Sequence, residues 1–558
     1  MVNVPWWNKL GKPQYGGELV MRANSNIVDF DPCMSQLANI YSLWLEKLVA
    51  DDWTLNPAIF DYKPHWHPSL YMRGNLAQSW EFTDQCTYVV HLKTGICWQN
   101  IPPANGREFI ADDVVFHYNR LRNLSVSSSN KGLRVTPVKQ FQDLISVHAS
   151  DKYTVVFKWK NLNPELIMET LHQVGPPSSI ENPDAVIKWG DVSDWHHAIG
   201  TGPFILKDFD SDNSAILVKN DNYWGYDERH PDNRLPYLDR VKFLIIPDEE
   251  QAIAAMREGK IDIMDQVSPL QAQAIRKTNP EILLITHPDS NPFPIDPRND
   301  IAPFNDIRIR KAMQKAIDLQ SISKNYYRGS VEPYPVTFTS RYMKEWGLPY
   351  EEWPPDLKDE YAYNPAAAKA LLAEAGYPNG FKTNIVVDKA ADTNLLGIVK
   401  SYFAQVGIDM EIRMMQTDAW VDFVMIGHRH DQLAHHPGGP LGHTSSPNHD
   451  LKIFQKGSRA NYTMVDDPVF NAFLPKALAS TSLDDVKQVM RDANEYVARQ
   501  HFTISLLQPM GYSLCQPWLK GFNAQFGSAW AHGGGPGMLS FYLGRFWIDH
   551  DLKKSLGR

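Results

Sequence analysis

Residues 76–121 constrain the fold more than any other stretch of this chain. Within it, residues 88–92 (YVVHL) alternate and are rich in β-branched and aromatic residues, which predicts a strand. Residues 93–95 (KTG) are typical of a turn, and residues 96–98 (ICW) are predicted to start the returning strand of a hairpin. A helix is expected from Ala111, because apolar residues recur there at helical spacing and two aspartates occupy its first turn. None of these residues suggests catalysis, so the stretch is interpreted as a scaffold.

The chain is too long for a single hydrophobic core. With 558 residues it is expected to form two or three domains. Residues 383–387 and 409–414 are predicted strands, and residues 395–406 form a predicted helix between them. This alternating order indicates the α/β class. Residues 287–304 contain five prolines, and this change of composition predicts a crossing between domains.

Net charge and hydropathy limit the kinds of partner that this protein can bind. The net charge of -9 argues against nucleic acid, because phosphate binding needs a basic surface. No run approaches the ~18 apolar residues that a membrane span needs. The first residues lack the apolar segment of a signal peptide, so the protein is either cytosolic or a trimmed, exported form.

The cysteines leave two interpretations open. The four cysteines are Cys33, Cys86, Cys97 and Cys515, and none belongs to a C-x-x-C pair. Cys86 and Cys97 flank the predicted hairpin and could form a disulfide if the protein is exported. The favoured interpretation is that the cysteines are small buried residues.

Motifs for catalysis are missing from the sequence. It contains no H-E-x-x-H, no G-x-S-x-G and no G-x-x-x-x-G-K-[ST], so neither an enzyme nor a bound cofactor is expected. The most unusual segment is 427–449, which is rich in Gly, Pro and His. Its histidines are His428, His430, His435, His436, His443 and His449. No spacing among them matches a zinc signature, so no metal site is assigned. A loop of exposed or hydrogen-bonded histidines is favoured, a ligand-facing loop comes second, and a metal site comes last.

Several short motifs follow one another in the order of a known family. They are GGEL at 16–19, FDP at 30–32, LAQSW at 76–80, ADDVVF at 111–116, GTGPF at 200–204, NYW at 222–224, PYLD at 236–239, GKID at 259–262, PFNDIRIRKA at 303–312, YNP at 363–365 and GI at 407–408. The ordered set, which covers about residues 16–547, resembles the family 5 extracytoplasmic solute-binding proteins of ABC transporters, the peptide and nickel class.

The resemblance implies an α/β fold of the periplasmic-binding-protein type II, a clamshell of two lobes. Lobe one would comprise residues 1–49, 200–286 and 505–558. Residues 50–199 would form an extra subdomain of lobe one, and residues 287–504 would form lobe two. Two crossing segments, near 285–295 and 503–511, would act as the hinge, and ligand would bind between the lobes.

The resemblance also suggests site residues. Trp420 matches a ligand-side Trp of the family, although a core Trp is an equal alternative. Peptide binders often carry an Asp in a W-x-x-D-Y context that captures the peptide's amine, and the matching region 431–440 (DQLAHHPGGP) lacks that pattern. Candidates in this region are Asp431, His435 and His436. Candidates from the loop after Pro32, which faces ligand in the family, are Gln36, Ala38 and Asn39.

The function implied by the resemblance is capture of a small solute, with peptide as the default, and delivery to an ABC permease. An oligosaccharide, an aromatic compound or a metal chelate are alternative ligands, and a hydrolase acting in the cleft is a remote one. The expected location is extracytoplasmic, either in the periplasm or as a cell-surface lipoprotein. Contact with the membrane would come only through the permease or a lipid anchor, and the protein is expected to be a monomer without nucleic-acid partners.

Overall fold

The computed structural model divides into two compact units, and each is considered by itself. Unit 1 comprises Met1–His287 and Gly511–Arg558, and unit 2 comprises Pro288–Met510. The structure describes residues 5–24, 26, 30–33, 40–64, 66–84, 86–122, 141, 143–160, 171, 178–288, 294–338, 345–389, 391–435, 447–480, 482–525 and 538–558.

The main sheet of unit 1 has seven strands. Their order is β14-β19-β13-β1-β12-β9-β8. The bounds are β1 (Glu18–Ala23), β8 (Phe204–Asp210), β9 (Ser214–Lys219), β12 (Arg240–Ile245), β13 (Ile263–Met264), β14 (Leu283–Pro288) and β19 (Met510–Cys515). Strand β1 is parallel to both of its neighbours, and its buried residues Leu19, Met21 and Ala23 belong to the main core of the unit.

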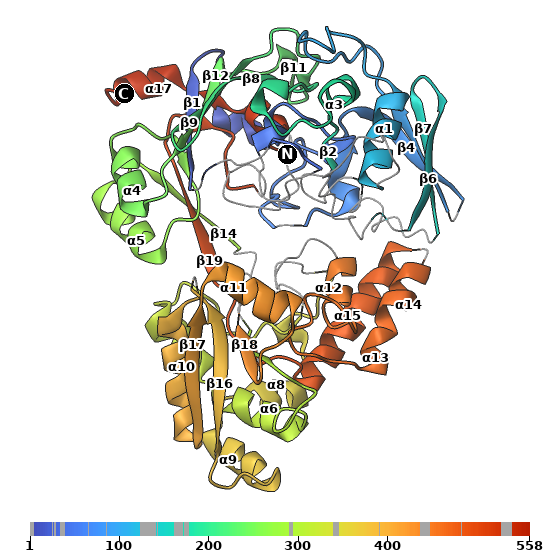
Figure 1. Cartoon of the computed structure of the whole chain (residues 1–558). Coiled ribbons are helices and arrows are strands. Elements are labelled where there is room, and N and C mark those ends of the chain that lie inside the picture. The colour runs from blue at the N-terminus through green and yellow to red at the C-terminus, as the bar shows by residue number, and fades with distance from the viewer. Residues whose placement is uncertain are drawn as a thin grey trace. The chain divides into compact units, whose positions relative to one another are not determined.

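A second sheet of unit 1 contains two strands from residues 76–121. It is antiparallel, with the order β4-β5-β7-β6. The bounds are β4 (Ala77–Asp84), β5 (Thr87–Leu92), β6 (Leu144–Asp151) and β7 (Thr154–Trp159). Helix α1 (Ala111–Leu121) packs against β6 and β7 (Figure 1). The predicted strand and helix are therefore confirmed.

The predicted hairpin between residues 88–92 and 96–98 is wrong. Strand β5 is paired along both edges, with β4 on one side and β7 on the other, so it has no free edge for a third partner. Residues 96–98 instead contribute one isolated bridge, between Cys97 and Glu108. The turn-forming residues 93–95 indicated that the chain changes direction, but they did not show which strands pair with β5.

Unit 1 also contains short elements around the two sheets. Its remaining strands are β2 (Val49–Asp51), β3 (Met72–Gly74), β10 (Tyr226–Asp227), β11 (His230–Arg234), β20 (Leu519–Lys520) and β21 (Trp547–Ile548). Its other helices are α3 (Pro183–Trp189), α4 (Glu249–Arg257), α5 (Pro269–Thr278), α16 (Leu539–Arg545) and α17 (His550–Ser555), with short 3-10 helices at Trp6–Leu10, Ile40–Leu43, Ser69–Tyr71 and Trp195–His197.

The sheet of unit 2 confirms the predicted alternation of strand and helix. Its order is β15-β18-β16-β17, built from β15 (Asp296–Pro297), β16 (Phe381–Asp388), β17 (Ile408–Met415) and β18 (Leu433–His435). Helix α10 (Thr393–Gln405) connects β16 to the parallel β17 and packs against β17 (Figure 1). Asp392 begins this helix by accepting a hydrogen bond from the Leu395 amide, and the buried residues Leu396 and Phe403 lie in the core of the unit.

The remaining helices of unit 2 are short, except for the last. They are α6 (Ile307–Lys315), α7 (Leu319–Ser321), α8 (Pro355–Tyr361), α9 (Pro365–Glu374), α11 (Thr417–Trp420), α12 (Pro447–Ile453), α13 (Pro468–Asn471), α14 (Phe473–Ala479) and α15 (Leu483–Gln500), with π-helical turns at Ile322–Tyr326 and Val421–Ile426 and a 3-10 helix at Tyr350–Glu352.

The predicted domain boundaries can be compared with this division. The chain leaves unit 1 after His287 and returns after Met510, where the sequence predicted boundaries at 287 and 505. Residues 50–199 belong to unit 1, and Val90 and Phe157 from this range share one core with Leu217. The extra subdomain and the hinge stay predictions, and residues 289–293 of the first crossing lie outside the described residues.

The four cysteines are free thiols in this structure. Cys33 and Cys515 are buried, Cys86 is half-buried and Cys97 is exposed. No disulfide joins Cys86 to Cys97, and the favoured interpretation as buried residues is confirmed for Cys33 and Cys515.

Candidate functional site

The carboxyl end of the unit 2 sheet is the candidate binding region. Strands β16, β17 and β18 run parallel to one another, and they end at Asp388, Met415 and His435. In open α/β sheets, ligands usually bind beyond the carboxyl ends of parallel strands. Helix α11, which contains Trp420, directly follows the end of β17.

One face of this sheet carries a small cluster that we call the Trp420 face. Its members are Asp296, Val386, Trp420, Ala434 and Tyr462. Asp296 belongs to it because it lies directly opposite Ala434 in the antiparallel pair β15–β18, and directly opposite residues point to the same side. The Trp420 indole nitrogen donates to the Val386 carbonyl at 3.4 Å, and its ring meets that of Tyr462 edge to face at 5.4 Å.

Asp296 is the most unusual member of the Trp420 face. Its side chain is only 1% exposed, and neither carboxyl oxygen has a hydrogen-bond partner in the part of the chain that the structure describes. Burial raises the pKa of the Asp296 carboxyl well above its ordinary value, which favours the neutral form of the group. A cationic ligand group placed here would find an acceptor that none of the described residues uses.

His430 lies next to this face, and its neutral form is also favoured. Its Nε2 lies 2.9 Å from the Tyr462 carbonyl oxygen, while Nδ1 has no hydrogen-bond partner among the described residues. Burial, assisted by the positive charge of Arg298, lowers the pKa of His430 to about 4. His428 also uses its ring within the protein, with Nε2 at 3.1 Å from the carbonyl oxygen of Met425.

The structure separates the predicted site residues of unit 2. Trp420 is fully buried in the cluster described above. His435 lies one residue beyond Ala434 on β18, so it points to the opposite face, where Nδ1 is 2.8 Å from the Pro294 carbonyl oxygen. Asp431 precedes β18, roughly 13 Å of extended chain from His435. Its exposed carboxylate accepts a hydrogen bond from Asn384 at 3.2 Å.

Four of the predicted site residues lie outside the described residues: Gln36, Ala38, Asn39 and His436. His443 lies outside them as well, and the side chain of His449 is not described. Within the described part of residues 427–449, no group of three metal-ligating side chains forms. The assignment of these residues to a ligand site therefore stays a prediction.

Sequence reasoning did not single out Asp296. It is one carboxylate among 64 and lies in the proline-rich stretch 287–304, which was interpreted only as a crossing. The nearest signal was its position between apolar neighbours, since Ile295 on one side is fully buried. Its lack of a partner depends on the pairing of β15 with β18, which the sequence does not reveal.

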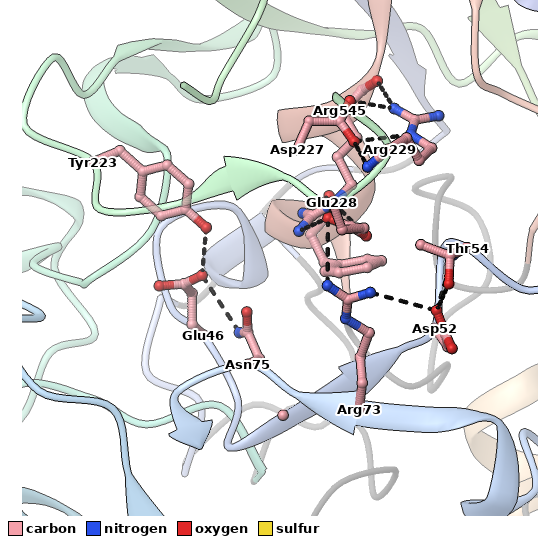
Figure 2. Close-up of polar contacts among 12 residues, drawn as sticks. Glu46, Asp52, Thr54, Arg73, Asn75, Tyr223, Asp227, Glu228, Arg229 and Arg545 are labelled. Atoms are coloured by element: carbon pink, nitrogen blue, oxygen red, sulfur yellow. Dashed lines mark hydrogen bonds and ion pairs between the residues drawn. The ribbon is translucent and has the colours of Figure 1, made fainter. Parts of the chain in front are cut away.

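Unit 1 contains a buried polar network of a different kind, which Figure 2 shows. Glu46 is 1% exposed and accepts hydrogen bonds from Tyr223 Oη at 2.8 Å and Trp224 Nε1 at 3.0 Å. Asn75 Nδ2 donates to the same carboxylate at 3.4 Å. Burial raises the pKa of Glu46 more than these donors lower it. The carboxyl group is thus fully used by the protein.

The charged members of this network are paired. Arg229 donates to both carboxylate oxygens of Asp227, at 3.0 and 2.9 Å, and both side chains are buried. Arg545 lies 2.9 Å from Glu228, and Arg73 lies 3.9 Å from the same carboxylate. Since these charges are paired and Glu46 is satisfied by hydrogen bonds, the network is interpreted as support for the fold rather than as a ligand site.

Comparison with known proteins identifies the family of the chain. Residues 72–461 match the bacterial extracellular solute-binding proteins, family 5. A heme-binding protein A from Haemophilus influenzae is 26% identical over 468 residues, which are 80% of this chain and 81% of that protein. A dipeptide-binding protein from Escherichia coli is 28% identical over 354 residues, 60% of this chain and 62% of that protein.

Solved structures share the fold. A periplasmic binding protein associated with an ABC transporter of Helicobacter pylori, solved with the peptide STSA, superposes with a TM-score of 0.70 over 96% of this chain and 99% of that chain, at 21% identity. It shows the type II periplasmic-binding fold that the motifs predicted. Among the helices that the structure describes, none has both the length and the apolar character to cross a membrane. The chain belongs to the bacterial extracellular solute-binding proteins of family 5.

Proposed function

We propose that this protein is the substrate-binding component of an ABC importer and that it captures a short peptide for delivery to a membrane permease. The observation that carries the proposal is the family match over residues 72–461. It is supported by a relative named as a dipeptide-binding protein and by a structural neighbour solved with a bound peptide. The protein acts by binding and release, without catalysis.

Asp296 is the group that receives the α-amine of the peptide in this proposal. Its carboxyl group, which has no hydrogen-bond partner among the described residues, lies on the sheet face that also carries Trp420 and Tyr462. An ammonium group brought to it would favour the ionised carboxylate, which releases its proton, and the two opposite charges would form a charge-assisted hydrogen bond that is strong in a dry environment. This residue takes the role that the missing W-x-x-D-Y pattern left open.

The other predicted site residues complete the proposed site. Trp420 forms its apolar wall, and the segments 34–39 and 431–436 supply further contacts to the ligand. They include the three candidates Gln36, Ala38 and Asn39, and the three candidates Asp431, His435 and His436. The protein works as an extracytoplasmic monomer, either free in the periplasm or anchored by lipid.

A metal chelate is the second candidate ligand. The heme-binding protein of H. influenzae aligns over a larger share of both chains than the dipeptide-binding protein of E. coli. Heme is flat and aromatic, and imidazole is a common ligand of its iron. The histidine-rich segment 427–449 would supply such ligands.

Thermal shift measurements with a defined ligand panel test the proposal. The panel contains Ala-Ala, Ala-Ala-Ala, their N-acetylated forms, glutathione, maltotriose and hemin. A ligand that binds the folded state raises the melting temperature, with a free-energy gain of RT ln(1 + [L]/Kd). We expect the free di- and tripeptides to raise it and the acetylated forms to have a much smaller effect.

The variant Asp296→Asn separates the two parts of the proposal. It should abolish the difference between free and acetylated peptides, whereas Glu411→Gln, which changes an exposed carboxylate of β17, should preserve it. If hemin raises the melting temperature and no peptide does, the proposed ligand is the metal chelate and not a peptide. If no compound in the panel shifts the melting temperature, the peptide-binding proposal fails.

A further inference from the structure

Three side chains that can bind metals converge inside unit 1, away from the Trp420 face. They are Cys33, His117 on helix α1 and Glu181 just before helix α3. One ligand atom from each lies within 4.8 Å of the others, and all three residues are buried. The Cys33 sulfur is 3.8 Å from Glu181 Oε1, and His117 Nδ1 contacts Glu181 Oε2. This is the single group of its kind that the described residues form.

A surrounding layer of hydrogen bonds holds these three side chains in position. Asp31 accepts a hydrogen bond from the Cys33 amide at 2.8 Å, which fixes the backbone at the cysteine. Arg120, one turn after His117, forms an ion pair with Asp31 and donates to Glu181 Oε1 at 3.3 Å. Metal sites in proteins usually have such outer partners, which orient the ligands before the ion binds.

The combination of ligand types indicates which ion would fit. A thiolate, an imidazole and a carboxylate are the donors that zinc prefers, and sites with three protein ligands keep a fourth position for another ligand. The formal charges also match. A divalent ion would be neutralised by the Cys33 thiolate and the Glu181 carboxylate, while Arg120 and Asp31 neutralise each other. A trivalent or monovalent ion would leave a net charge in a buried place.

There is also space beside the cluster. Glu181 lines a small cavity together with Asn182 and His197. Asn182 Nδ2 and His197 Nδ1 are buried polar atoms that have no hydrogen-bond partner among the described residues. A water molecule or other small ligand near Glu181 would satisfy such atoms.

We propose that Cys33, His117 and Glu181 bind one divalent transition-metal ion of the zinc type. The three ligands come from separate segments of the chain, so the ion would join the segment after Phe30 to helix α1 and to the start of α3. Cys33 directly precedes residues 34–39, which the family resemblance implies to face ligand. The ion would fix the chain at Cys33.

Cobalt is the probe for this site, because a Co²⁺–thiolate bond gives a charge-transfer absorption that Zn²⁺ does not. The purified full chain, freed of metal by a chelator and desalted, is titrated with Co²⁺. We expect one equivalent to bind with a thiolate band, and an equivalent of Zn²⁺ to remove the band. Cys33→Ser should abolish the band and weaken Zn²⁺ binding by at least about tenfold. His117→Gln should weaken Zn²⁺ binding as well.

Cys515→Ser is the matched control, because it removes another buried thiol of unit 1 that lies outside the cluster. It should keep both the band and the stoichiometry. Far-ultraviolet circular dichroism verifies that each variant is folded, and Zn²⁺ binding by the wild type gives a second measurement that needs no variant. A wild type that binds neither Co²⁺ nor Zn²⁺, or binding that Cys33→Ser leaves unchanged, would overturn the proposal and leave the cluster as a hydrogen-bond network.

Discussion

Each unit buries an aspartate, but the surroundings of the two carboxyl groups differ. In unit 1, Asp227 and Arg229 are buried together, with side chains 0% and 1% exposed, and form a bidentate pair. Burial raises the pKa of Asp227, yet the hydrogen bonds and charge of Arg229 outweigh it and the net pKa is lowered. In unit 2, Asp296 has no opposite charge beside it among the residues that the structure describes, and burial raises its pKa.

This difference indicates where a ligand can bind. A paired charge has its partner already and offers little to an incoming group, whereas an unpaired polar group keeps its full capacity to form hydrogen bonds. A buried polar group without a partner lowers the stability of the fold, so such a group is usually found where function requires it. Ionisable groups with shifted pKa values also tend to gather at functional sites. The contrast therefore favours the Trp420 face over the unit 1 network as the ligand site.

The largest effect is expected when the unit 1 pair is broken. Arg229→Met keeps much of the side-chain volume but leaves Asp227 buried, with only Tyr237 Oη at 2.8 Å as a side-chain donor. Removing one partner of a buried pair typically costs about 3–5 kcal/mol. We expect that loss in the free energy of unfolding, measured by urea denaturation.

The pair formed by Glu411 and Arg413 is a matched control. Its two residues are two positions apart in the sequence, as Asp227 and Arg229 are, but their side chains are 62% and 48% exposed. Arg413→Met should cost less than about 1 kcal/mol, because exposed pairs contribute little. Equal losses in the two variants would contradict the view that the unit 1 network depends on buried charge pairing.

Replacement of His430 is expected to have a smaller effect on the free energy of unfolding, and this effect depends on pH. Its pKa is about 4 in the folded protein, below the value near 6.5 of an unfolded chain. The unfolded state thus binds more protons between these values, and stability falls as the pH drops from about 6.5 to about 4. His430→Gln should remove up to about 3 kcal/mol of this loss. The free energy of unfolding of the wild type and of the His430→Gln variant is measured across this pH range.

His196→Gln provides the comparison for that experiment. The His196 side chain is 65% exposed, so its replacement should leave the pH profile of the wild type nearly unchanged. A His430→Gln profile that falls as steeply as the wild type would mean that another group causes the loss.

The sequence predicted the local pieces of the fold better than their pairing. The order of strand, helix and strand in residues 383–414 is confirmed, because hydrophobic periodicity reports which segments are buried and in what conformation. The hairpin at residues 88–98 failed, because the choice of strand partner depends on segments far away in the chain, here β4 and β7. Ordered motifs supplied the family, which no single pattern would have shown.

The candidate site was harder to predict than the fold. Trp420 was singled out by its motif, but its complete burial comes from contacts with Val386 and Tyr462. Asp296 carried no motif, and its lack of a partner is a property of the folded sheet. The same holds for Cys33 and His117, which are 84 positions apart in sequence (117 − 33) and meet only through the fold.

The smallest effect on the free energy of unfolding is expected from replacing Asp296, and here the variant should be more stable than the wild type. Asp296→Asn replaces the carboxyl group by a neutral group of the same shape. The folded pKa of Asp296 is raised, so the folded protein retains a proton that the unfolded chain releases above about pH 4. Wild-type stability therefore declines with rising pH above that point, and the variant should escape the decline.

At pH 7 we expect the variant to be more stable than the wild type by about 1–3 kcal/mol, because the amide is neutral without taking up a proton and each unit of raised pKa corresponds to about 1.4 kcal/mol. Urea denaturation at pH 4 and pH 7 measures both proteins, and the difference should shrink at the lower pH. Asp227→Asn is the control from the paired network and should destabilise at both, because it leaves the buried guanidinium of Arg229 without its carboxylate. If Asp296→Asn destabilises the protein as Asp227→Asn does, the carboxylate at 296 is charged and paired in solution, and the contrast between the two units is lost.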